Sequence, residues 1–376
     1  MSKVLLGDVA VEHKETCKGS KDGYPIVGLE HLIPEEITLT AWNEGSENTF
    51  SKMFRKGNVL FGRRRAYLKK AAVAPFDGIC SGDITVIEAK PDRILPELLP
   101  FIIQNDDLFE FAVGKSAGSL SPRVKWEHLK NYEFELPDME KQKELAELLW
   151  AMDNTKKSYQ KLIVATDELV KSQFMEQFSD VKKRETLEAL SINGPQNGFY
   201  RKADGSVPNT HIVKMKELFA NECIADETSF DMVNMTPNEQ KRFELTPDDL
   251  LFGRRSLVVE GAGKCRRVGD ITLPLAFESS LLRITLDTER VLPRFVQAWF
   301  DTDEGRRAII SIRAVTTISG IKGSDLKRVL IPVPTLEQQE CFLAFVRQSD
   351  KSKFELEKAL SELTATYKRI IAENLG

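Results

Sequence analysis

Basic side chains gather in one stretch of the first third of the chain. Between Lys52 and Lys70 the sequence carries eight lysine and arginine residues and no acidic residue. Lysine and arginine neutralise phosphate, and arginine can bond O6 and N7 of guanine at the same time. The pattern therefore predicts a basic face on the first domain, of a kind that can contact phosphate. The alternative is a solvated basic strand edge, which discourages pairing with other strands.

Candidate contact residues can be named by their chemistry in both halves of the chain. In the first half they are Arg63, Arg64, Arg65, Tyr67, Lys69 and Lys70, with Lys115, Ser119, Arg123 and Lys125 further along. In the second half they are Arg254, Arg255, Lys264, Arg266 and Arg267, a set diluted by Glu260, with Arg313, Thr316, Thr317 and Lys322 further along. We expect these residues to form phosphate clamps or to reach base edges.

The sequence lacks the residue patterns that would support catalysis within this chain. The histidines have no metal-ligand spacing, no Asn-Pro-Pro-Tyr or Asp-Pro-Pro-Tyr run for amine methylation is present, and no Pro-Asp pair is followed at nuclease-like spacing by Glu-x-Lys. The glycine-rich segment 261–264 resembles a phosphate-binding loop, but Cys265 stands where serine or threonine is needed. We therefore expect a chain that is not an enzyme and that needs no metal or cofactor.

The composition is typical of a folded, soluble protein. The 376 residues suggest about two to three domains, and the net charge of -4 argues mildly against non-specific coating of nucleic acid. The five cysteines lie far apart without a Cys-x-x-Cys pair, so we expect them to be reduced. No apolar run is long enough for a membrane span, and the first residues lack the apolar core of a signal peptide. A cytoplasmic location follows as the default expectation.

The chain contains an internal repeat. The pentapeptide Leu60–Arg64 recurs as Leu251–Arg255, an offset of 191 residues. Downstream the offset settles at 197, where Glu140-Lys141-Gln142 aligns with Glu337-Gln338-Gln339 and Asp153 with Asp350. The preserved order of the matches predicts two diverged copies, residues 3–178 and 184–371, of one unit.

The first part of each copy mixes strands with short helices. In the first copy, residue types favour strands at 26–29, 59–61, 84–87 and 132–136. Apolar spacing predicts one helix over 96–111, and a short helix over 122–130 has Ser121 as its expected N-cap. Without regular βαβ alternation, the pattern indicates an α+β domain.

The second part of each copy is a long helix. After Pro137 no glycine or proline appears until Gly194, and the sequence through Phe178 is rich in helix formers. A heptad seam is predicted in the first helix at Leu145, Leu148, Met152, Thr155, Tyr159, Leu162, Thr166 and Leu169, with a flanking row at Leu149, Ile163, Val170 and Phe174. The same positions shifted by 197 give the stripe of the second helix. We expect the two helices to pair as an antiparallel coiled coil; the alternative is that each packs only on its own globular domain.

These expectations divide the chain into four parts. The first globular domain spans 1–136, a central helix 137–180, the second globular domain 181–333 and a C-terminal helix 334–376. With two globular ends and a helical pair between them, the predicted molecule is a dumbbell with pseudo-twofold symmetry.

The repeated unit resembles the DNA-specificity subunit of type I restriction-modification systems over essentially the whole chain. The resemblance depends on a strand ending in Leu-Phe-Gly-Arg-Arg, a later Ser-x-x-x-Lys-x-x-x-Leu-Lys element, and a proline followed by Glu-x-Gln at the start of a long helix. The most specific segments are 136–142 and 333–339. The first departs from the family's Pro-x-x-Glu-Gln helix start because Lys141 precedes Gln142.

The resemblance implies a non-catalytic, sequence-specific DNA-binding subunit. Each globular domain would be a target recognition domain that reads one half of a bipartite sequence in double-stranded DNA. The helices would set the gap between the half-sites and dock two methyltransferase subunits, with a separate restriction and motor subunit as a further partner. The competing hypothesis is a tandem-repeat coiled-coil scaffold or regulator that binds protein partners without reading DNA.

Overall fold

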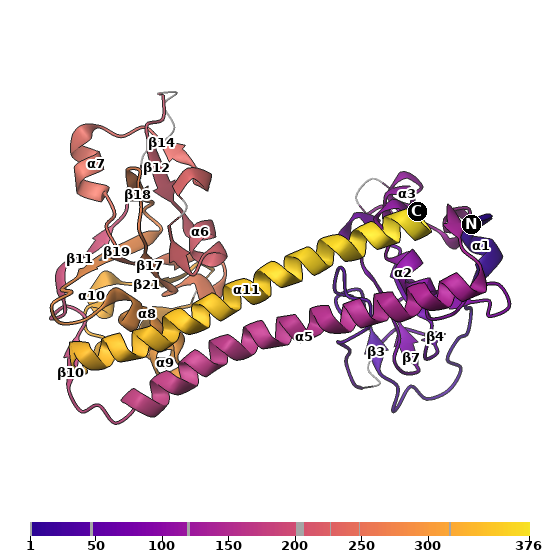
Figure 1. Ribbon diagram of the computed structural model, residues 1–376, viewed down its shortest axis with the longest axis horizontal. Coiled ribbons are helices and arrows are strands. Elements are labelled where there is room, and N and C mark those ends of the chain that lie inside the picture. The colour runs from indigo at the N-terminus through magenta and orange to yellow at the C-terminus, as the bar shows by residue number, and fades with distance from the viewer. Residues whose placement is uncertain are drawn as a thin grey trace. The chain divides into compact units, whose positions relative to one another are not determined.

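The computed structural model divides the chain into two compact units. It describes residues 2–45, 48–118, 121–200, 207–225, 227–247, 249–315 and 317–376. The first unit consists of Met1–Leu162 with Leu356–Gly376, and the second of Ile163–Glu355. Two 40-residue helices, α5 (Met139–Phe178) and α11 (Leu336–Leu375), therefore each contribute one part to both units (Figure 1).

The strands of the first unit form a four-stranded sheet and two smaller ones. The antiparallel four-stranded sheet has the order β2 (Ala10–Glu12), β8 (Ile84–Ala89), β5 (Val59–Gly62), β6 (Ala71–Val73). A three-stranded sheet has the order β3 (Ile26–Val27), β7 (Gly78–Cys80), β4 (Lys52–Phe54), and β1 (Ser2–Leu5) pairs with β9 (Glu133–Leu136). The four strands expected from the sequence are thus present, with small differences at their ends.

The short helices of the first unit correct two sequence predictions. They are α1 (Leu6–Val9), the 3-10 turn η1 (Ala66–Leu68), α2 (Leu99–Ile103), α3 (Asp106–Gly114) and α4 (Trp126–Leu129). The single helix expected over 96–111 is broken at Asn105, because the Asn105 side chain accepts a hydrogen bond from the amide of Asp107 and so begins a second helix. Ser121 is not an N-cap: its hydroxyl accepts a hydrogen bond from Arg64, and α4 begins after Lys125.

The second unit has a larger sheet. Its five strands have the order β11 (Ser191–Asn197), β19 (Leu281–Leu286), β15 (Asp249–Gly253), β17 (Cys265–Val268), β13 (Cys223–Ile224). Smaller sheets have the orders β14 (Met232–Val233), β12 (Thr210–Val213), β18 (Leu275–Phe277), and β16 (Arg255–Ser256), β21 (Ser319–Ile321), β20 (Arg313–Ala314). Strand β10 (Arg184–Thr186) pairs with β22 (Leu330–Pro332).

Helices complete the second unit. They are α6 (Met215–Ala220), η2 (Glu227–Ser229), α7 (Pro237–Phe243), η3 (Val259–Gly261), α8 (Pro293–Asp301), α9 (Asp303–Ile312) and α10 (Gly323–Leu326). Within the described ranges, every helix is too short or too polar to serve as a membrane span.

Aromatic side chains join the long helices to the globular core within each unit. In the second unit, the ring of Phe174 on α5 lies 5.0 Å from that of Phe295 on α8 and 5.3 Å from that of Phe342 on α11. In the first unit, Phe101 on α2 contacts Trp150 on α5 at 5.1 Å and Tyr367 on α11 at 6.1 Å. The long helices are therefore part of both hydrophobic cores.

The two long helices are confirmed, but the heptad seam predicted for α5 is wrong at several positions. Leu162 and Leu169 of the seam are 50% and 52% exposed, whereas Leu149 and Phe174 of the flanking row are buried. A straight helix repeats every 3.6 residues, so a strict seven-residue pattern drifts around its surface. Because α5 also packs against globular elements, its buried stripe follows the 3.6-residue period.

A buried glutamine fixes the start of each long helix. The Gln142 side-chain oxygen accepts a hydrogen bond from the Leu95 amide at 2.8 Å, and its nitrogen donates to the Pro137 carbonyl at 2.9 Å. Both the oxygen and the nitrogen of the side chain are thereby hydrogen-bonded. The same two bonds join the helix start to the segment before α2.

The second unit repeats this arrangement. The Gln339 side-chain oxygen accepts from the Leu292 amide at 2.9 Å, and its nitrogen donates to the Pro334 carbonyl at 3.0 Å. The Glu-x-Gln motif in the sequence therefore marks a structural connection between helix and globular domain.

Replacing Gln142 by alanine should destabilise the protein. The change leaves the Leu95 amide and the Pro137 carbonyl without their partner, which should cost about 2 kcal/mol of unfolding free energy. Chemical denaturation measures the effect, with the exposed neighbour Lys143→Ala as the control. Equal stability of the two variants would contradict the role assigned to Gln142.

Candidate nucleic-acid interface

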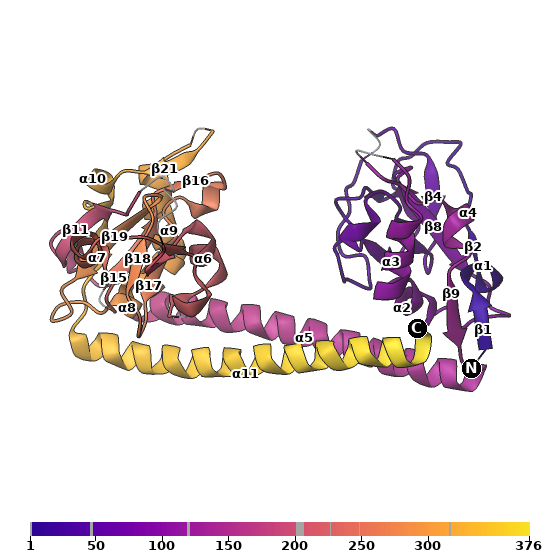
Figure 2. The ribbon, with the colours of Figure 1, turned by 90° about the horizontal axis from the view of Figure 1, so that it is seen from above.

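Arginines that follow strand β15 line a hollow in the second unit. Strand β16 begins at Arg255 and pairs with β21 (Figure 2). Strand β21 pairs in turn with β20, so a short three-stranded sheet forms. The hollow beside this sheet has a volume of about 490 Å³. It is lined by Asn197, Arg254, Arg255, Ala314, Ile318, Gly320, Ile321, Lys322 and Gly323.

The hollow carries positive charge. The lining residues all lie in the described part of the chain, and none of them is acidic. Arg254 is partly buried and donates a hydrogen bond to the Ser279 carbonyl at 3.1 Å, while Arg255 and Lys322 are exposed. Burial, followed by the charge of Arg255, lowers the pKa of Arg254 from its ordinary value. These three predicted residues are therefore brought together at a surface suited to an anionic partner.

Glycine is required where the chain turns away from β15. A Cβ atom at Gly253 would collide with the carbonyl oxygen of Gly261. Gly253 itself donates to the Lys264 carbonyl at 2.9 Å, so the loop returns close to the strand end. This close approach explains why the sequence before the arginines contains glycine.

The other predicted residues of the second unit are more engaged within the protein. Lys264 lies 5.0 Å from the ring of Phe219, and burial lowers its pKa. Arg266 donates to the Asn221 carbonyl and lies 3.6 Å from Asp301. Arg267 is partly buried, and Arg313 donates to the Val259 carbonyl. Thr317 is exposed, and Thr316 lies outside the described residues.

In the first unit, too, the arginines lie beside a segment that is distant in the sequence. Arg64 pairs with Arg123 as an isolated antiparallel bridge, and Ala117 pairs with Arg123 on the other side. The Val124 amide donates to the Arg63 carbonyl at 3.0 Å. Residues about sixty positions apart in the sequence are therefore adjacent in the first unit. The same holds in the second unit, where the Ile321 amide donates to the Arg254 carbonyl.

Asp83 binds two of these arginines. It accepts a hydrogen bond from Arg123 Nε at 2.7 Å and lies 3.6 Å from Arg64 Nη1. The hydrogen bond from Arg123 lowers the pKa of Asp83 below its ordinary value, while desolvation by burial opposes this effect. The carboxylate holds the guanidinium groups in place and reduces the net positive charge of this surface.

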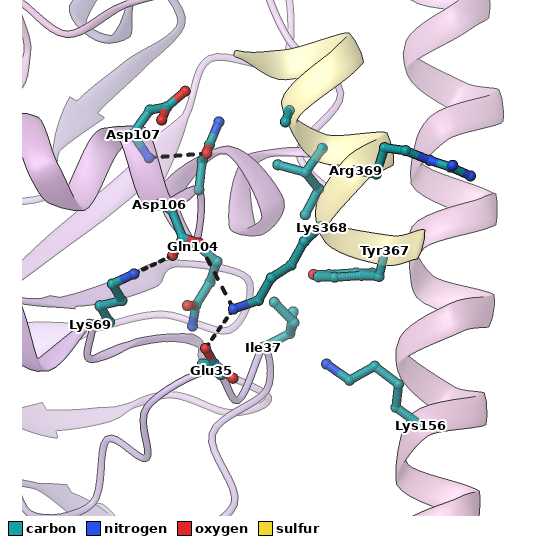
Figure 3. A pocket seen from close by; sticks show the side chains of 13 residues that line it. Glu35, Ile37, Lys69, Gln104, Asp106, Asp107, Lys156, Tyr367, Lys368 and Arg369 are labelled. Atoms are coloured by element: carbon teal, nitrogen blue, oxygen red, sulfur yellow. Dashed lines mark hydrogen bonds and ion pairs between the residues drawn. The ribbon is translucent and has the colours of Figure 1, made fainter. Parts of the chain in front are cut away.

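The remaining predicted residues of the first unit differ in their surroundings. Lys69 forms an ion pair with Asp106 at 2.6 Å, in a pocket of about 370 Å³ that also contains Tyr367 and Lys368 (Figure 3). Lys70 donates to the Leu29 carbonyl, the Nε of Arg63 is buried without a partner, and Lys115 lies near the Phe111 ring. The exposed ones are Arg65, Tyr67 and Lys125, and Ser119 lies outside the described residues.

Sequence reasoning missed Asn197 and Asp83. Asn197 ends strand β11 and lines the hollow in the second unit. An asparagine can bond adenine N6 and N7, so its chemistry fits such a surface. Its position became apparent only with the pairing of β11 and β19, and no motif in the sequence connects Asp83 with Arg123.

Comparison with protein families supports the resemblance found in the sequence. Residues 4–164 match the model of the type I restriction modification DNA specificity domain. The recognition of this family is thereby confirmed for the first unit's globular part and the beginning of α5. A search of the curated proteins found no match.

Solved structures share the fold over almost the full length. A chain from a structure described as the structural basis underlying complex assembly and conformational transition of the type I R-M system is 18% identical, with a TM-score of 0.61, and the match covers 99% of this chain and 97% of that one. The type I restriction-modification S subunit from M. genitalium is 12% identical, with a TM-score of 0.54, and the match covers 98% and 94%. The family match thus supports a DNA-specificity domain in residues 4–164, and the solved structures show that the fold is shared beyond it.

The Asp83→Asn variant should lose stability in a pH-dependent way. Because the folded-state pKa of Asp83 is lowered, its carboxylate stabilises the fold above the ordinary pKa of 3.8, and this contribution is lost as pH falls through the lowered folded-state value. We expect the wild type to be more stable than the variant at pH 7 and the difference to shrink as the pH falls below 3.8. Denaturation at several pH values measures it; a constant difference would rule out this role of the carboxylate.

Proposed function

We propose that the chain is the non-catalytic DNA-specificity subunit of a type I restriction-modification complex. Each globular domain binds one half of a bipartite sequence in double-stranded DNA. The observation that carries the proposal is a local arrangement found in both units. The Arg63 carbonyl accepts from the Val124 amide in one unit, and the Arg254 carbonyl accepts from the Ile321 amide in the other, both at 3.0 Å.

This arrangement extends the resemblance beyond the family match. The match ends at residue 164, whereas Arg254 and Ile321 lie in the second unit. The sequence offsets of 191 and 197 that align the two copies also align these two hydrogen bonds. The repeat therefore supports two target recognition domains, 1–136 and 181–333, each followed by a spacer helix, 137–180 and 334–376.

Contacts inside each unit support an antiparallel pairing of the spacer helices. In the second unit, Phe174 near the end of α5 contacts Phe342 near the start of α11. In the first unit, Lys156 in the first half of α5 lies over the ring of Tyr367 near the end of α11, 4.8 Å from its centre. The order along one helix is thus reversed along the other, and the pair can set a fixed gap between half-sites.

The exposed apolar residues of the helices offer binding surface for protein partners. Leu162, Val164 and Leu169 on α5 and Phe354 on α11 are each at least half exposed. Leu162 and Leu169 lie seven positions apart and so share one face of α5, and apolar side chains grouped on a helix surface favour a protein interface. We infer that two methyltransferase subunits bind here, that a restriction and motor subunit joins through them, and that the complex works in the cytoplasm.

The alternative function is a scaffold that joins protein partners without reading DNA. It would use the same helices, but it gives no role to the positively charged hollow formed by Arg254, Arg255 and Lys322. A stable complex with methyltransferase subunits whose assembly and activity have no DNA-sequence dependence would favour the scaffold.

Neutralising the hollow should reduce the salt dependence of DNA binding. In the complex with methyltransferase subunits, Arg255→Gln with Lys322→Gln should lower the magnitude of the slope of log K against log salt by about 1.8, because each lost phosphate contact removes about 0.9. Equilibrium binding to duplex DNA at several salt concentrations measures it. Lys182→Gln with Arg328→Gln, exposed cations elsewhere in the same unit, is the matched control, and an unchanged slope in the first variant would remove the hollow from the interface.

Lengthening both helices should widen the gap between half-sites. Seven residues inserted after Leu162 and seven after Glu355, where the two units meet in the sequence, add about 10 Å of helix, or about three base pairs. Mapping of methylated adenines in cells measures the gap. An active variant with the original gap would contradict the spacer role.

A further inference from the structure

Each unit exposes apolar side chains directly after its arginines. In the second unit, Leu257 and Val258 follow β16 and are 81% and 53% exposed. In the first unit, Tyr67 and Leu68 follow Arg65 and are 55% and 40% exposed. We call these two pairs the apolar tips. Exposed side chains of this size bring no benefit to the isolated fold, so their recurrence at neighbouring positions of the two copies points to a partner.

Hydrogen bonds hold the tip of the second unit in a defined shape. The Ser256 hydroxyl accepts from the Val258 amide at 3.1 Å, and the Val258 carbonyl accepts from the Gly261 amide at 3.0 Å. Arg313 on β20 donates to the Val259 carbonyl at 2.7 Å. The tip is therefore fixed beside the cations before any partner binds.

The tip of the first unit is equally constrained. The Arg65 amide donates to the Pro122 carbonyl at 2.8 Å, and the Leu68 amide donates to the Arg65 carbonyl at 2.9 Å. Arg65 and Lys69, which flank the 3-10 turn, have positive φ angles of 55° and 51°. Residues other than glycine adopt this left-handed conformation rarely, and such outliers concentrate at functional sites.

We propose that the apolar tips insert between stacked bases of the DNA when the arginines contact its backbone. Exposed cations beside each tip, Arg65 in the first unit and Arg255 in the second, give the surroundings an affinity for phosphate. Apolar side chains inserted at a base step unstack it partially and bend the duplex. The tips would therefore select half-sites by how easily a base step opens, in addition to hydrogen bonds with base edges. This inference rests on the proposed function.

The test uses the complex with methyltransferase subunits and a duplex that contains the methylated sequence found by mapping. The base analogue 2-aminopurine, whose fluorescence rises on unstacking, is placed at one position at a time. The methylated adenine and its neighbours are left unchanged because methyltransferases flip their target base. We expect a rise at one base step in each half-site, measured at saturating protein concentration and low salt.

Two pairs of variants test the origin of the rise. Leu257→Ala with Val258→Ala should abolish the rise in one half-site only, and Tyr67→Ala with Leu68→Ala should abolish it in the other. Leu330→Ala with Val207→Ala, matched exposed residues of the second unit, should leave both rises in place. Because the substituted side chains are largely exposed, the variants should fold normally, which gel filtration and denaturation check.

The outcomes separate this inference from the proposed function. Specific binding of the wild-type complex without a rise at any position, or the same rise in the tip variants, would overturn base insertion and leave the DNA-specificity role intact. Release of the methyltransferase subunits by Leu257→Ala with Val258→Ala in the absence of DNA would show that the tip binds protein, and would also overturn it. Absence of any sequence-specific DNA binding would refute the proposed function itself.

Discussion

A single buried amide determines how each long helix meets its globular domain. Gln142 and Gln339 are almost fully buried, and each satisfies a backbone N–H and a backbone carbonyl that would otherwise lack a partner. An unsatisfied group in such a place is costly, so the direction of the helix start is closely restricted. If the helices set the gap between half-sites, this restriction also fixes each reading surface relative to its end of the spacer.

The two surfaces differ in how much of their positive charge is neutralised by acidic side chains. In the first unit, Asp83 contacts Arg64 and Arg123, so part of the positive charge is neutralised within the protein. In the second unit, no acidic residue lines the hollow beside Arg254 and Arg255. Phosphate contacts supply affinity without sequence information, whereas base contacts and DNA deformability supply specificity. The two surfaces thus present different side chains to an anionic partner.

Much of the architecture was predictable because it repeats. The long helices and the strands around Leu60 and Ile84 follow from apolar periodicity and residue type, and the Glu-x-Gln motif located both helix starts. The break at Asn105 was missed because an asparagine within an apolar pattern gives no sign of whether its side chain caps a new helix. The seam of α5 was misplaced because a sequence does not reveal that a helix packs against globular elements as well as against another helix.

The candidate site was predictable in kind and less so in detail. Runs of arginine indicated an anionic partner, but the sequence could not separate Arg255, which is exposed, from Arg266, which bonds to the backbone and approaches Asp301. Neither Asn197 nor Asp83 lies in a recognisable sequence motif. Each comes close to the arginines only through strand pairing or long-range contact. Contacts of this kind depend on the folded chain.

The most direct measurement of the central claim is a domain exchange followed by a map of methylated adenines across the host genome. Residues 3–135 are replaced by the corresponding domain of a type I specificity subunit whose target is known, and α5 and α11 are kept. We predict a hybrid target in which one half-site is replaced, while the other half-site and the gap remain. A map in which both half-sites change, or neither, would contradict independent reading by two domains.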